Sequence, residues 1–190
     1  MPMSTVCKIR TNSEPSLQAN KNLILLVWLI LLVVTPVHAV EKASEQRLDE
    51  VAERGSHVMP FDLEKTTHIF SKTDTGGIQQ VIAKDKSDTV QIDRIRLHLS
   101  EIARQFQQGD YSNPEKIHGA TMPGLAELKA AKPGQIKIVY KELPDGAEIT
   151  YATHIEKLKL AIHQWFDAQL SDHARHAVPG HPHDSGHHHH

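Results

Sequence analysis

The 190-residue sequence predicts an α+β fold, with two ββα repeats forming a four-stranded antiparallel sheet and two amphipathic helices on one face. Three observations predict this fold. Two pairs of β-prone runs each flank a glycine-containing turn, a helix-like pattern follows each pair, and the two halves align without a gap. We therefore place a duplicated ββα domain at residues 57–176.

The first unit combines a hairpin with a long helix. Residues 67–72 and 78–83 are β-prone runs on either side of the turn sequence Thr-Asp-Thr-Gly-Gly. From residue 87 to 108, apolar side chains recur every three or four positions, at Ile92, Ile95, Leu99, Ile102 and Phe106. This spacing predicts a helix with one apolar face, followed by a polar connector that contains Asn113-Pro114.

The second unit repeats this order. Residues 135–141 and 147–152 flank the turn Leu-Pro-Asp-Gly, and the pattern Thr153-His-Ile-Glu156 opens a second helix as a capping box. Its apolar positions are Leu158, Ile162, Trp165 and Phe166.

The case for duplication comes from alignment of the two units. Residues 69–84 fall on residues 138–153 without a gap, and residues 93–99 fall on residues 156–162. A ββα order is common, so chance similarity is the alternative. A pseudo-two-fold arrangement would leave the second face of the sheet open to a protein partner or to a second copy in a homodimer.

The N-terminal segment has the pattern of an export signal. Residues 23–34 are twelve consecutive apolar residues, and Lys8, Arg10 and Lys21 precede them. We predict a signal peptide at residues 1–39, cleaved after Ala39, and hence a periplasmic or secreted protein. An uncleaved membrane anchor is the alternative, but the apolar run is shorter than the roughly 20 residues that span a bilayer. Residues 40–56 would form an N-terminal helix or linker.

Charge and cysteine content exclude two classes of site. Without residues 1–39 the chain has 18 basic and 22 acidic residues, because Lys8, Arg10, Lys21 and Glu14 are removed. A mildly acidic chain lacks the basic stripe that nucleic-acid binding requires. The single cysteine, Cys7, lies in the signal segment, so the predicted mature chain has neither a disulfide nor a thiolate metal site.

Histidine is the residue type that departs most from average composition, with 15 in the chain. We predict a disordered histidine-rich tail at residues 177–190, and neutral imidazoles there and just before it suit copper, zinc or nickel. The candidate ligands in this region are His173, His176, His181 and His183. The last four histidines could alternatively be the remnant of an expression tag.

A second set of candidate ligands lies inside the domain. Each unit opens with a histidine close to a Met-Pro pair, and thioether sulfur together with imidazole favours copper. These candidates are His57, Met59, His68, His118 and Met122. The alternative is that the two methionines fill gaps in the core.

Three stretches of the domain carry a resemblance to a known family. They are HVMPFDLEKTTHIF from His57, HGATMPGLAEL from His118 and WFDAQLSDHARH from Trp165. They resemble a family of small exported bacterial proteins often labelled aspartate carbamoyltransferase, over roughly residues 57–176. The resemblance implies an exported context. True aspartate carbamoyltransferase chains have a Ser-Thr-Arg-Thr loop for carbamoyl phosphate that this sequence lacks, so no activity is implied.

The sequence also lacks the G-x-S-x-G, HExxH and P-loop motifs, and it predicts no catalytic residue. The leading hypothesis is an exported protein that binds a transition metal ion in metal homeostasis or buffering. The alternatives are a non-enzymatic periplasmic interaction module and an enzyme of unknown reaction.

Overall fold

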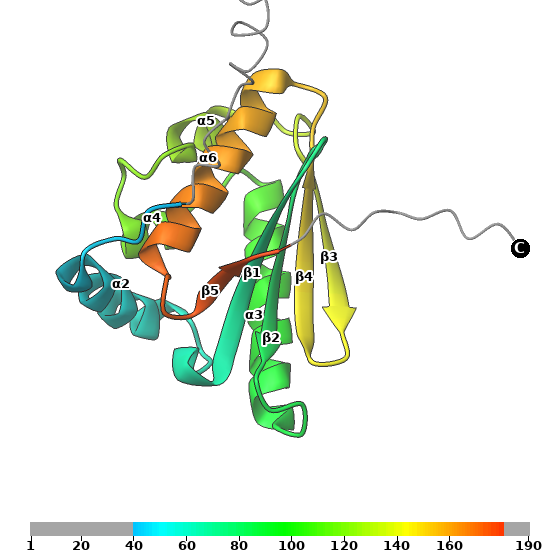
Figure 1. Cartoon of the computed structure of the whole chain (residues 1–190). Helices are drawn as coiled ribbons and strands as arrows, with labels where there is room; N and C mark the ends of the chain where they lie inside the picture. Colours follow the sequence, from blue (N-terminus) through cyan, green and yellow to red (C-terminus); the bar gives the residue numbers. More distant parts are fainter. Residues whose placement is uncertain (1–39, 181–190) are drawn as a thin grey trace, which may run out of the picture. The chain divides into compact units, whose positions relative to one another are not determined.

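The computed structural model describes residues 40–180, which form a mixed sheet with helices beside it (Figure 1). Five strands in this part of the chain run in the order β3-β4-β2-β1-β5. Their bounds are β1 Thr66–Thr73, β2 Gly76–Ala83, β3 Lys137–Leu143, β4 Gly146–Ala152 and β5 Ala177–Pro179. Together with the helices, this sheet confirms the α+β class.

The helices between and around the strands are of unequal length. The two long ones follow the two hairpins, as the periodicity predicts. The bounds are α2 Glu45–Val58, α3 Thr89–Gln107, α4 Ser112–His118, α5 Leu125–Ala130 and α6 Glu156–Asp172, with a short 3₁₀ turn, η1, at Leu63–Lys65. All five apolar positions predicted for the first helix are buried in α3. No helix in residues 40–180 is long and apolar enough to span a bilayer.

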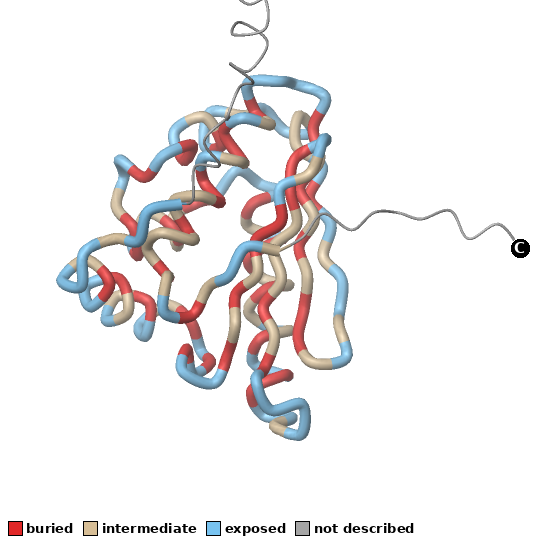
Figure 2. The backbone as a smooth tube through the Cα atoms, viewed as in Figure 1, coloured by how far each residue is buried: buried red, intermediate tan, exposed pale blue. Residues whose placement is uncertain are grey.

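Both long helices pack on one face of the sheet. Alternate strand residues face them, and Figure 2 shows the resulting change between buried and less buried positions along the strands. Tyr151 of β4 is 1% exposed, and its ring centroid lies 6.3 Å from that of Phe106 on α3 and 5.6 Å from that of Trp165 on α6. One tyrosine therefore joins the two helices and the sheet in a single core.

The opposite face of the sheet is more exposed. Register places Val139, Thr150 and Ile78 side by side on it, and Val178 of β5 is paired with Ile69. Val139 is 42% exposed and Val178 is 45% exposed. This face is therefore more exposed than the face that packs against α3 and α6.

The prediction of a four-stranded antiparallel sheet is wrong, because the sheet has a fifth strand. β5 pairs parallel with β1, and it forms from residues assigned to the disordered tail. The amide of His68 donates to the carbonyl of His176, and the amide of Gly180 donates to that of Phe70. Three residues are too few to show a strand periodicity in the sequence, and they become a strand by pairing with the edge of β1.

The segments that open the two predicted units differ in structure. The segment that opens the first unit contains the end of α2 and continues into η1. The segment that opens the second unit contains the end of α4 and continues into α5. The predicted connector at Asn113-Pro114 is helical because Pro114 lies in the first turn of α4, where its missing N–H is not needed. The two ββα repeats are therefore not confirmed. The predicted signal segment and the last ten residues lie outside the described residues.

Candidate functional site

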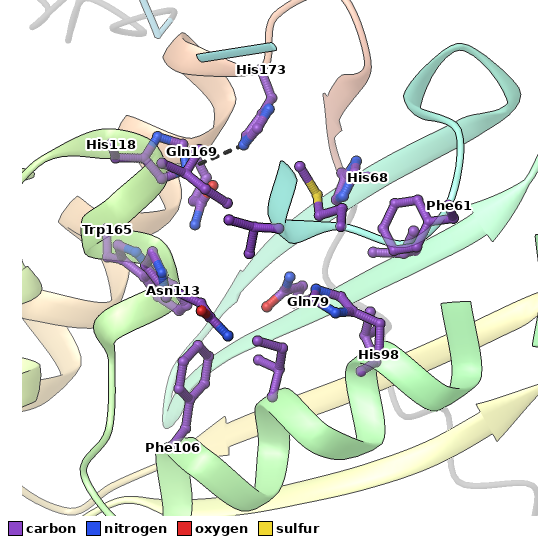
Figure 3. A pocket seen from close by; sticks show the side chains of 17 residues that line it. Phe61, His68, Gln79, His98, Phe106, Asn113, His118, Trp165, Gln169 and His173 are labelled. Carbon is purple, nitrogen blue, oxygen red and sulfur yellow. Dashed lines mark hydrogen bonds between the residues drawn. The ribbon is translucent and has the colours of Figure 1, made fainter. Parts of the chain in front are cut away.

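A cavity of about 50 Å³ lies between the sheet and helices α3, α4 and α6. Four histidines line it, as Figure 3 shows: His68, His98, His118 and His173. The side-chain amides of Gln79, Asn113 and Gln169 and the ring of Trp165 also line it. A water molecule needs roughly 10–15 Å³ by this kind of measure, so the cavity has room for a metal ion with its solvent ligands or for a very small molecule.

Two of these histidines face each other. Nε2 of His118, the last residue of α4, lies 3.2 Å from Nε2 of His173, which follows the last turn of α6. Nδ1 of His118 lies 2.8 Å from Oδ2 of Asp172. Because an ionised carboxylate only accepts, Nδ1 of His118 carries the proton and its Nε2 presents a lone pair to His173.

Asp172 is held by an arginine from the N-terminal helix. Arg47 of α2 donates from Nε to Oδ1 over 3.1 Å and from Nη2 to Oδ2 over 2.6 Å, and it also donates to the His118 carbonyl. Desolvation raises the pKa of Asp172, but hydrogen bonds and charges from His118 and Arg47 outweigh it and hold the pKa well below its usual range. Asp172 therefore stays ionised and fixes the orientation of His118.

Burial keeps the facing histidines neutral. Desolvation lowers the pKa of His173 well below its ordinary value and also lowers that of His118, where Asp172 partly offsets the effect. It lowers the pKa of His68 to about 3. The His68 ring lies parallel to that of His173 with centroids 5.5 Å apart, and its buried Nδ1 has no hydrogen-bond partner within residues 40–180. These imidazoles are uncharged near neutral pH, and Nε2 of His173 donates to the Nε2 lone pair of His118.

Only some of the predicted metal ligands lie at the cavity. Met59, His68, His118 and His173 line the cavity, whereas His57 is exposed at the end of α2 and Met122 is buried away from the cavity lining. Nε2 of His176 lies 2.7 Å from Oε1 of Glu64. His181 and His183 lie outside the described residues.

Sequence reasoning did not identify Arg47 or Asp172. Asp172 precedes His173 directly, so an Asp-His pair at the end of a predicted helix was an available signal. Arg47 lies 125 residues away from Asp172, and no sequence pattern connects them. Within the described part of the chain, no group of three or more His, Cys, Asp or Glu side chains has a metal-binding arrangement. The core thus offers two facing imidazoles and no complete ligand cage.

His98 gives a prediction about pH. Burial lowers its pKa to about 4, whereas an unfolded histidine titrates near 6.5. As the pH falls, the unfolded chain therefore takes up the proton first. The stability from neutral His98 is complete above about pH 6.5 and is lost between about 6.5 and 4.

We expect His98→Leu to reduce the fall in unfolding free energy between pH 7 and 5 by on the order of 1 kcal/mol. Urea unfolding of both proteins at each pH measures this. His154→Leu is the control variant, because His154 is an exposed histidine outside the cavity lining. An identical pH dependence in the parent chain and the His98 variant would contradict the prediction.

Comparison of the chain with protein-family models, with curated proteins and with solved structures gave no significant match.

Proposed function

We propose that this protein binds a transition metal ion, copper, zinc or nickel, through Nε2 of His118 and Nε2 of His173. The observation that carries the proposal is the 3.2 Å separation of these two atoms. Two nitrogens bound at about 2.0–2.1 Å to one tetrahedral ion lie about 3.3 Å apart. The pair is therefore spaced as two ligands of a single ion.

The residues around His118 and His173 also support metal binding by this pair. A ligating histidine commonly donates its other ring N–H to a carboxylate, which fixes the tautomer and makes the ligand more basic. Asp172 has this position beside His118, and Arg47 holds Asp172 in place. His68, whose unpartnered Nδ1 lies in the same cavity wall, is the next candidate ligand.

The cellular role is a further part of the proposal. The predicted signal segment supports export to the periplasm or beyond, where the protein would buffer or pass on metal. The histidine-rich tail, including His181 and His183, would add weaker ligands outside the core. The internal ββα duplication remains a prediction that the gapless alignment supports.

Metal titration by calorimetry tests the core site. We expect the chain to bind one ion tightly, and we expect His118→Ala and His173→Ala each to weaken binding by about 100-fold or more, since loss of a supporting partner alone costs 10–100-fold. His154→Ala is the matched control because His154 is exposed and lies outside the cavity lining. A chain with the tail histidines replaced by serine should keep the tight site. Unchanged affinity in both core variants would refute the proposal.

An enzyme is a second candidate, because His118 lines the cavity and its Nδ1 lies beside the carboxylate of Asp172. His118 oriented by Asp172 has the arrangement of a general base. It would take a proton from water or from a small bound substrate. Turnover that disappears in His118→Gln, without any added metal, would favour this candidate over metal storage. A non-enzymatic module that uses the more open sheet face for a protein partner or a homodimer is the remaining alternative.

A further inference from the structure

A second and larger cavity lies between α2 and α4. Its volume is about 430 Å³, and it is lined by Arg54, His57, Val58, Asn113 and Lys116. Three of these five residues are basic types, and none is acidic. We name this cavity the α2–α4 cleft. It is largely open to solvent, so a bound molecule would stay partly exposed.

The two elements present the basic side chains from opposite walls. Arg54 and His57 lie in the last turns of α2, Lys116 lies on α4, and the two helices are in contact. His57 and Lys116 are exposed, so both can reach a molecule in the cleft. Val58 and Asn113 also line the histidine cavity, so the two cavities share a wall.

Arg54 contacts Glu50 of the same helix but keeps one nitrogen without a hydrogen bond. Its Nε donates to the Glu50 carbonyl over 3.2 Å, but its buried Nη2 has no hydrogen-bond partner within residues 40–180. The Glu50 carboxylate lies 3.7 Å from Nη2 and forms an ion pair with Arg54, although the distance is beyond hydrogen-bond range. Because the Arg54 side chain is 39% exposed, an oxyanion in the cleft can reach its guanidinium and compete with Glu50 for it.

We propose that the α2–α4 cleft binds a small oxyanion, a molecule with a carboxylate or phosphate group, through Arg54 and Lys116. A planar guanidinium matches two oxygens of such a group, and an ammonium supplies a second charge from the other wall. His57 adds an imidazole donor at the same site. The anion would lie beside the histidine cavity, and its binding needs no metal ion.

Calorimetry on the metal-free full chain at low ionic strength tests this inference, with succinate and inorganic phosphate as the two probes. We expect one of them to bind with a stoichiometry of one, and the stronger of the two identifies the oxyanion class. Arg54→Gln and Lys116→Gln should each weaken that binding by about tenfold or more, because a hydrogen bond to a charged group is lost. Added sodium chloride should weaken it as well.

Arg94→Gln is the matched control, since Arg94 is an exposed arginine on α3 outside the cleft. It should bind the probe as the parent chain does. Failure of both probes to bind, or equal affinity in the Arg54, Lys116 and Arg94 variants, would overturn the inference. Because no metal is present, either result leaves the separate question of metal binding at His118 and His173 unaffected.

Discussion

Replacing Phe166 with alanine is expected to lower the free energy of unfolding by about 3–5 kcal/mol, the range for removing a large aromatic side chain from a core. Phe166 is fully buried on α6, and its ring centroid lies 5.1 Å from that of Phe70 and 5.8 Å from that of Tyr151. A Cβ atom added at Gly77 would lie 2.3 Å from the Phe166 ring, so the ring sits directly on the β2 backbone. Truncation would leave a cavity that the surrounding sheet cannot fill.

Urea unfolding followed by circular dichroism measures this effect. Leu160→Ala on the same helix is the control, because Leu160 is 55% exposed and its truncation removes little buried surface. A loss of less than about 1 kcal/mol in the Phe166 variant would show that α6 does not pack on the sheet as described.

Replacing Asp172 with alanine is expected to lower the free energy of unfolding by about 1.5–3 kcal/mol, because hydrogen bonds to charged groups are lost from a partly buried pair. The Asp172 side chain is 12% exposed, and that of its partner Arg47 is 30% exposed. The lost carboxylate also frees His118 to rotate. If the metal proposal holds, metal affinity should fall by about 10–100-fold in addition.

The stabilising contribution of Asp172 should depend on pH. The folded-state pKa of Asp172 lies below its unfolded value of about 3.9, so its stabilising contribution is present above about pH 4 and is lost as the pH falls further. The difference in unfolding free energy between the parent chain and Asp172→Ala should therefore shrink in acid. Asp167→Ala is the control on α6, since Asp167 pairs with Lys72 at the surface and such pairs contribute about 0–1 kcal/mol. Equal losses in the two variants would contradict the prediction.

The elements that sequence reasoning identified are those with a strong local signal. The apolar spacing predicts α3, and the glycine turns predict both hairpins, because each of these patterns follows from a regular local backbone geometry. β5 and the helices α4 and α5 are short, and they form where neighbouring elements provide partners. The residues Asp172 and Arg47 are a similar case, since they meet only after α2 has packed against α6.

By itself, the sequence determined the α+β class, the two hairpins with their following helices and the presence of many imidazoles. Local periodicity and turn chemistry are sufficient for these features. Only the tertiary structure decided which histidines meet. His118 and His173 are 55 residues apart, and packing at the ends of α4 and α6 brings their Nε2 atoms to 3.2 Å. Such contacts depend on how whole elements dock, because burial against several partners at once sets the docking and no single stretch of sequence encodes it.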